Sequence, residues 1–320
     1  MSPSSAVTVA LLASTSILVA AQDTILSCAD VKCPTFPQRA SNDCNITSSS
    51  YSNVGVSKIP GLPSSLGGLT WVEAIAVDDS NPQRRFIKDF YLGSDPNANT
   101  EDLGSCALFF TKVSRNVVFK DSRDITSAQG TCAEAMSQEC VSKLLQRAQG
   151  VDLQGLPSKE ACSQLKSVFE GRMDTECASF ATGAAWEGVE AKELSGPGAP
   201  SAITSSQNSS TNCWPIEPKS FNLAPVATIV TNGTNNIVAG EQDLFKITPI
   251  LTVVFPSSNS SGVSRTAAQL TCMKAIDMSV AKNSTKVGDP NESAAPGRLS
   301  VGATTAALIV ALITFVTQLC

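Results

Sequence analysis

The sequence predicts an α+β protein: a β-rich, sandwich-like body with a disulfide-stapled helical segment and a Ser/Thr-rich stalk. Three observations favour this fold class. Segments with strand-like alternation of apolar and polar residues occur on both sides of one stretch with helical periodicity. Of the eleven cysteines, all but Cys320 lie between the two apolar ends of the chain. Ser, Thr and Asn then become frequent before the C-terminal apolar run.

Composition divides the chain into consecutive parts with different expected roles. They are a signal peptide (1–21), an N-terminal β-rich part (22–126), a disulfide-stapled helical segment (127–194), a linker (195–212), a C-terminal β-rich part (213–280), a stalk (281–293) and a propeptide absent from the mature form (294–320). About 270 residues remain after both end signals are removed, which is enough for one large domain or two small ones.

The N-terminal part begins with an almost uncharged run, Val7–Ala21, which ends in the small residues Val-Ala-Ala before Gln22. This pattern is typical of a secretory signal peptide. A buried N-terminal helix is the alternative reading, but a polar, cysteine-rich stretch follows immediately. The run is also too short to span a bilayer.

The first β-rich part should follow a lead-in held by closely spaced cysteines, Cys28–Cys44. Alternation then predicts a half-buried strand at Leu69–Val77. Turn residues separate the further strand candidates Phe86–Leu92, Cys106–Val113 and Asn116–Lys120.

The periodicity changes to that of a helix between Thr131 and Gln149. Apolar residues recur there every four positions, which predicts one amphipathic helix ending at Gly150. A second helix is predicted from Ser158, as N-cap, to about Glu170. A third, short helix should follow Asp174.

Strands are expected again after the Gly/Pro/Ser/Thr-rich segment 195–212. The candidates are Val226–Val230, Phe245–Phe255 and Leu270–Met278. The sequons at Asn232 and Asn259 fall in the gaps after the first two, where exposed turns should lie.

An even number of cysteines in an exported chain predicts disulfides, here five from ten residues. The cysteines concerned are Cys28, Cys33, Cys44, Cys106, Cys132, Cys140, Cys162, Cys177, Cys213 and Cys272. Facing helices suggest the nested bridges Cys132–Cys177 and Cys140–Cys162, and Cys213 could pair with Cys272, although spacing alone does not determine connectivity. Zinc is the competing use of clustered cysteines, but the chain has neither a CxxC pair nor a histidine, so we expect no metal.

Six sequons predict N-glycosylation, which requires exposed acceptor loops in an exported protein. The acceptors are Asn45, Asn208, Asn232, Asn259, Asn283 and Asn291.

The C-terminal end has the pattern of a glycolipid (GPI) attachment signal. Small residues around Ser293 precede a spacer, Pro296–Thr305, and an apolar tail, Ala306–Cys320. We expect attachment at Ser293, with Asn291 and Gly297 as alternatives. A transmembrane helix over about Leu299–Leu319 is the competing interpretation, but no Lys or Arg follows it and Arg298 lies on its outer side.

Several short stretches together resemble a group of secreted, GPI-anchored fungal cell-surface glycoproteins of the ascomycete type. They are Phe90–Gly93, Gly104–Phe110, Gly130–Cys132, Trp214–Pro215 with Pro218–Ser220, Thr248–Thr252 and Leu270–Cys272, and they cover most of the mature chain. The resemblance implies a place on the fungal cell surface or in the wall, and it implies no reaction. The cysteine spacing does not fit the compact eight-cysteine fungal haem-binding module, so haem binding is not expected.

The absence of histidine removes several kinds of catalysis. Ser-His-Asp and Cys-His nucleophiles, HExxH zinc peptidases and histidine-brace copper sites all need that residue. A glycosidase needs only two carboxylates. The candidates are Glu73, Asp78, Asp79, Asp89, Glu101, Asp102 and Asp243, and their spacing selects no pair. A net charge of −5 without basic runs argues against nucleic acid as a partner.

These observations favour a GPI-anchored extracellular glycoprotein with a non-catalytic structural or interaction role. Its expected partners are the membrane, through the lipid anchor, and wall polysaccharide or other surface proteins; no cofactor is expected. The alternative is a wall-polysaccharide hydrolase or transglycosylase that uses two carboxylates. A third possibility is a carrier that holds an apolar ligand inside the β-rich body.

Overall fold

The computed structural model describes residues 22, 24–33, 44–62, 66, 68–80, 84–98, 103–120, 124–209, 213–232, 242–257 and 265–276. All of them belong to one compact unit, Met1–Asn283. The chain is 36% strand and 17% helix, which confirms the prediction of a β-rich α+β protein.

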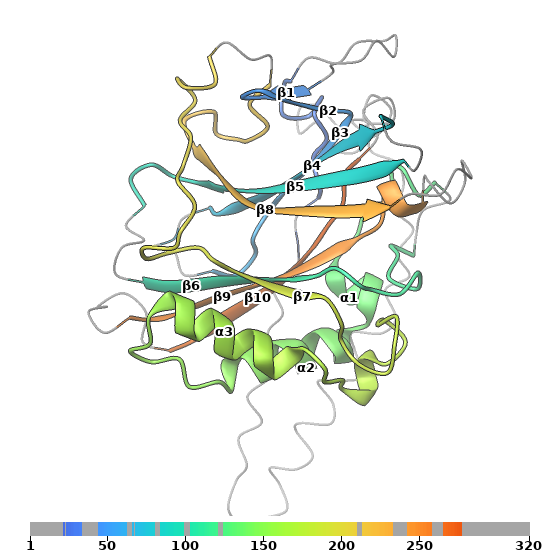
Figure 1. Ribbon diagram of the computed structural model, residues 1–320, viewed down its shortest axis with the longest axis vertical. Helices are drawn as coiled ribbons and strands as arrows, with labels where there is room; N and C mark the ends of the chain where they lie inside the picture. The colour runs from blue at the N-terminus through green and yellow to red at the C-terminus, as the bar shows by residue number, and fades with distance from the viewer. Residues whose placement is uncertain are drawn as a thin grey trace, which may run out of the picture. The chain divides into compact units, whose positions relative to one another are not determined.

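The first of two four-stranded antiparallel sheets contains β3 (Asn53–Lys58), β4 (Thr70–Asp78), β5 (Arg85–Ser94) and β8 (Asn222–Asn232) in that order. The second has the order β10 (Ala267–Met273), β9 (Thr248–Pro256), β6 (Leu103–Phe110) and β7 (Val189–Glu193). Figure 1 shows the two sheets one above the other.

The strand period of two gives each sheet an inner and an outer face. On the inner faces, Trp71 and Phe90 of the first sheet pack against Phe109 of the second, with ring centroids 5.5 and 5.1 Å from that of Phe109. The Trp71 indole Nε1 donates a hydrogen bond of 3.0 Å to Thr252 Oγ1 on β9. Trp71 is therefore a core residue, as expected from its alternating position.

Each outer face is covered by a different part of the chain (Figure 1). The hairpin of β1 (Cys44–Ile46) and β2 (Ser49–Tyr51) packs over the first sheet, against residues such as Val54 and Val72. The helices α1 (Cys132–Met136), α2 (Gln138–Gln149) and α3 (Ser158–Phe169) cover the second sheet. The result is a sandwich with a cap on both sides.

The predicted parts of the chain are interleaved in these sheets. β8 from the C-terminal β-rich part pairs with β5 from the N-terminal part, and β9 pairs with β6. The segment predicted as a linker packs onto the same body: Ile203 bridges to Leu223, and the buried Ser195 Oγ lies 3.1 Å from Ser158 Oγ. The described residues of both β-rich parts thus belong to one compact unit.

Most predicted elements are present, with four corrections. Ser158, the expected N-cap of the second predicted helix, is the first residue of α3, and Pro157 is its N-cap. The single helix over Thr131–Gln149 is two helices, because Ser137 adopts φ 65° and interrupts it. The third helix is only a 3-10 turn, η2 (Thr175–Cys177). Asn116–Lys120 is not a strand: its alternate residues are buried, but Val117 N–H donates to Ser114 O within a turn.

Four strands were not predicted: β1, β2, β3 and β7. The first two have only three residues each, too few for a period to show. β3 contains Gly55, which lacks a side chain because a Cβ there would lie 1.9 Å from the carbonyl oxygen of Lys274. β7 is a charged edge strand, Val-Glu-Ala-Lys-Glu, and such composition usually indicates a loop.

Candidate functional site

Several predicted site residues lie outside the described residues. These are the attachment residues Ser293, Asn291 and Gly297, the sequons at Asn259 and Asn283, and the acids Glu101 and Asp102. Among the residues that are described, no helix has the length and apolar character needed to cross a bilayer.

Two of the described sequon asparagines are accessible. Asn45 lies on β1, half-buried, and its Oδ1 accepts a hydrogen bond of 2.6 Å from Ser50 Oγ. Asn232 is the exposed last residue of β8.

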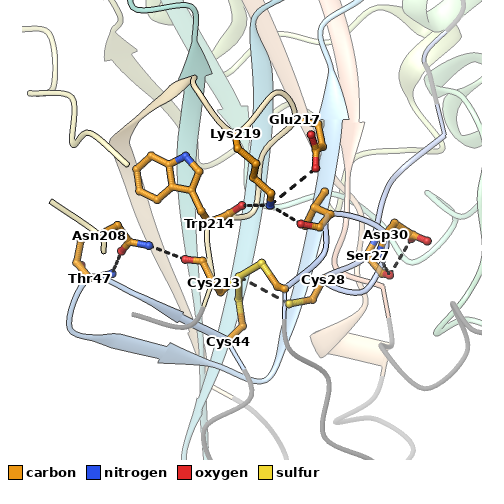
Figure 2. Close-up of a disulfide and its surroundings, with 12 residues drawn as sticks. Ser27, Cys28, Asp30, Cys44, Thr47, Asn208, Cys213, Trp214, Glu217 and Lys219 are labelled. Carbon is orange, nitrogen blue, oxygen red and sulfur yellow. Dashed lines mark hydrogen bonds and ion pairs between the residues drawn. A yellow bond between two sulfur atoms is a disulfide. The ribbon is translucent and has the colours of Figure 1, made fainter. Parts of the chain in front are cut away.

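Asn208 does not fit the expectation of an exposed acceptor. Its side chain is only 4% exposed. Its Nδ2, the atom that would carry a glycan, donates a hydrogen bond of 2.6 Å to Cys213 O, and its Oδ1 accepts one of 2.6 Å from Thr47 N (Figure 2). The amide therefore has a structural role: it joins the β1–β2 turn to the start of the segment that leads into β8.

Three disulfides connect the helices to the rest of the body. Cys106 on β6 is bonded to Cys162 on α3, Cys132 on α1 to Cys272 on β10, and Cys140 on α2 to Cys177 in η2. The pairings suggested by helix spacing, Cys132–Cys177, Cys140–Cys162 and Cys213–Cys272, are wrong. The break at Ser137 puts Cys132 and Cys140 on different helices, so they do not share one face.

The remaining four cysteines form one buried cluster under the first sheet's cap, which we call the four-sulfur cluster: Cys28, Cys33, Cys44 and Cys213. All four Sγ atoms lie within 4.8 Å of one another. Cys213 Sγ is within bonding reach of both Cys33 and Cys44, and Cys28 Sγ is 3.7 Å away from it. Figure 2 shows the sulfurs converging where the N-terminal segment meets residue 213.

One sulfur forms one disulfide, so the contacts of Cys213 with Cys33 and Cys44 exclude each other. Four sulfurs at this spacing can form two disulfides, in one of three pairings. They are also a possible tetrahedral ligand set for a structural zinc ion, which needs four thiolates around one centre. The choice between them depends on the compartment, since disulfides persist in oxidising surroundings.

A lysine fastens the loop beside the four-sulfur cluster (Figure 2). Lys219 Nζ donates to the backbone oxygen of Trp214, at 2.6 Å, and to that of Val31. Glu217 lies 3.9 Å from the same nitrogen. Burial lowers the pKa of Lys219, and the neighbouring Glu217 opposes that effect. These bonds link the loop after Cys213 to the turn that carries Cys28 and Cys33.

A second unusual group is a buried ion pair between the two sheets. Lys88 on β5 donates to Glu73 Oε1 on β4 and to the backbone oxygen of Lys246, both at 2.8 Å. The side chain of Lys88 is 5% exposed and that of Glu73 is 0% exposed. Complete burial raises the pKa of Glu73, while the attraction of Lys88 acts in the opposite direction. Glu73 Oε2 has no hydrogen-bond partner among the described residues.

A cavity of about 870 Å³ opens near this ion pair. Its walls come from residues 113–120, 125–128 and 242–247, together with Thr182 and Lys274. Lys274 is 1% exposed, its Nζ donates to Ile125 O, and it lies 5.9 Å from the centre of the Phe245 ring. Burial lowers the pKa of Lys274 to about 8, although Glu73 and Asp124 act in the opposite direction.

Four of the acids proposed for a glycosidase have other partners. Asp78 pairs with Arg85, Asp79 pairs with Arg84, and Asp89 accepts a hydrogen bond of 2.8 Å from Tyr51 Oη. Glu73 is buried in its pair with Lys88, and Asp243 is at the wall of the cavity.

The aromatic residues do not form a sugar-binding surface. All three tryptophans and both tyrosines of the chain are buried: Trp71, Trp186, Trp214, Tyr51 and Tyr91. Sugar clefts usually present such rings to solvent, and here they pack in the core.

Comparison with family models, with curated proteins and with solved structures finds no match. Functional conclusions about this chain therefore rest on its own residues.

The sequence did not indicate the cavity or the charges around it. One signal was present: Lys88 alternates with Phe86 and Phe90 along β5, and Lys274 directly follows the mainly apolar strand β10. A buried strand seldom contains a cation without a reason, because an unpaired buried charge is costly.

Proposed function

We propose that this chain is an extracellular glycoprotein of the fungal cell surface or wall, held by a glycolipid anchor, with a non-catalytic structural or interaction role. The observation that carries the proposal is the number of disulfides that join separate layers. Cysteines on all three helices bond to other elements, and the four-sulfur cluster joins the N-terminal segment to residue 213. Such cross-links form and persist in the secretory pathway and outside the cell.

The cross-links also suit a molecule exposed to the environment. Each disulfide restricts the unfolded chain and contributes about 2–4 kcal/mol in typical cases. The bridge Cys132–Cys272 closes a loop of 140 residues, and Cys106–Cys162 one of 56. A body held in this way tolerates the loss of individual surface contacts without unfolding.

The non-catalytic role is supported by the state of the candidate acids and rings. Glu73, Asp78 and Asp79 are in ion pairs, and Asp89 is hydrogen-bonded to Tyr51. Every tryptophan and tyrosine is buried. The alternative, a wall-polysaccharide hydrolase or transglycosylase, requires two facing acids in a groove. It has no observation in its favour.

The anchor is tested on intact cells that express the full chain. Treatment with a phosphatidylinositol-specific phospholipase should release the protein, and a variant truncated after Gly297 should be secreted. Protein that stays on the membrane after treatment, and that takes up no labelled ethanolamine, would overturn the proposal of a glycolipid anchor. Secretion of the truncated variant alone does not decide between an anchor and a transmembrane helix, so the ethanolamine label is the decisive readout.

A further inference from the structure

We infer that the cavity beside Lys274 binds an amphipathic organic anion, namely a long-chain carboxylate, with its carboxylate at Lys274 and its chain against the apolar walls. This inference goes beyond the proposed function, which names no ligand, and it holds whether or not the chain is anchored. It depends on three features of the cavity: its charge, its walls and its size.

The first feature is a concentration of positive charge. Among the residues that the structure describes, the cavity wall contains the cations Arg115, Lys120, Lys246 and Lys274 and one carboxylate, Asp243. Two further acids act on Lys274 through their charge: Glu73, which is bonded to Lys88, and Asp124. Among the described residues around the cavity, the cations therefore outnumber the acids.

Lys274 is the cation best placed to meet a ligand. It is almost fully buried, yet it lines the cavity. The hydrogen bond that the structure gives it among the described residues goes to a neutral backbone oxygen, Ile125 O. A buried ammonium without a directly bonded carboxylate is costly, and an anion in the cavity would supply the missing charge.

The second feature is the apolar part of the wall. Val117, Phe119, Ala128, Phe245 and Ile247 line the cavity and are themselves buried. These side chains come from three separate segments of the chain, residues 117–119, 128 and 245–247. A hydrocarbon chain suits apolar walls of this kind better than a small, fully polar anion does.

The third feature is the volume. A space of about 870 Å³ lies within the usual range of small-molecule sites, which are mainly apolar with a few polar groups that fix orientation. A cationic end and an apolar wall in one cavity match a molecule with one anionic end and one hydrocarbon end.

The experiment measures equilibrium binding of tritiated hexadecanoate to the purified mature chain, with hexadecanol and acetate as competitors. We expect saturable binding with one site per chain. Hexadecanol lacks the charge, so it should compete at least about tenfold less well, the effect of one charge-assisted hydrogen bond. Acetate lacks the chain and should not compete.

Two variants test the position of the site. Lys274→Met should weaken hexadecanoate binding about tenfold and leave the affinity for hexadecanol unchanged, so that hexadecanol then competes about as well as unlabelled hexadecanoate. Ala128→Trp should fill the apolar space and abolish the binding of both hexadecanoate and hexadecanol. Lys166→Met, which removes an exposed lysine of α3, is the matched control and should bind as the wild type does. Near-ultraviolet circular dichroism establishes that each variant is folded.

Three results would overturn the inference: no saturable binding of hexadecanoate, equal competition by hexadecanol, or unchanged binding in folded Lys274→Met. The first would mean that the cavity holds no such ligand. The second or third would mean that the positive charge does not select it.

Discussion

Asn208 illustrates how one side chain can match a modification motif and still serve the fold. Both ends of its amide are hydrogen-bonded, and the residue is buried. We predict that peptide mapping of the mature protein finds no glycan at Asn208. Asn208→Gln should lower the free energy of unfolding by about 1–3 kcal/mol, because it displaces both hydrogen bonds. The matched change Asn45→Gln, at a half-buried position, should have a smaller effect; a glycan at Asn208 would contradict the assignment.

Lys274 gives a prediction of pH dependence. Its pKa falls from the ordinary 10.5 to about 8 in the folded protein. Between about pH 8 and 10.5 the unfolded chain binds this proton and the folded chain does not, so the free energy of unfolding rises with pH. A shift from 10.5 to about 8 corresponds to roughly 3 kcal/mol.

The measurement is denaturant unfolding at several pH values across this window, with disulfides intact. Wild type and Lys166→Met should become more stable as the pH rises, and Lys274→Met should show a smaller rise. The groups near Lys274 are Glu73, Asp124 and Lys88, and all three remain in the variant. Lys246, whose pKa burial also lowers, contributes equally to each protein. The same slope in Lys274→Met and wild type would contradict the assigned pKa.

The sequence predicts the chemical role of the cysteines better than it predicts which cysteine bonds to which. That the cysteines would be used for disulfides was predictable from their number, but all three specific pairings were wrong. Pairing depends on which layers face each other, and the sequence contains no direct signal of that. The cavity was missed for the same reason, since its walls come from segments far apart in the chain.

At the scale of elements, the junction between α1 and α2 is the clearest local feature. Ser137 has φ 65° and ψ 150°, a region that is favourable only for glycine and costs other residues about 1–3 kcal/mol. Its Oγ also accepts a hydrogen bond from Cys140 N, at 3.2 Å, and so caps α2. Strain and capping therefore act in opposite directions at one residue.

Two substitutions separate these effects. Ser137→Gly should raise the free energy of unfolding by about 1 kcal/mol, because it removes the strain and a glycine cap costs only a few tenths. Ser137→Ala keeps the strain and loses the cap, so this substitution should lower the free energy of unfolding by about 1 kcal/mol. Chemical denaturation of both variants checks the prediction. Equal effects of Gly and Ala would show that the backbone conformation at this position is not strained.

The longer elements were predictable and the short ones were not. β4, β5, β9 and α3 contain enough residues for a period to appear in the sequence. The segment around Val117 and Phe119 has the strand period, but Val117 N–H donates to Ser114 O within a turn. It pairs with no strand among the residues that the structure describes. Burial sets the pattern of apolar residues, whereas strand pairing depends on a neighbour that the local sequence does not specify.

At the scale of the folded body, the layers and their covalent links form one system. The cap over the first sheet and the helices over the second are each fastened by sulfur: the four-sulfur cluster on one side and three disulfides on the other. The inner core between the sheets is held by packing, including Trp71 and Phe109, and contains the buried pair of Glu73 and Lys88. The outer layers therefore depend most on an oxidising environment.

The most direct test of this account is a count of thiols and a disulfide map of the mature protein isolated from cells. Alkylation in denaturant without reductant should label none of the ten body cysteines. The map should contain Cys106–Cys162, Cys132–Cys272 and Cys140–Cys177, with two disulfides in a single pairing within the four-sulfur cluster. Four alkylated cysteines in that cluster, with one zinc ion released per chain, would contradict the account and identify the cluster as a metal site.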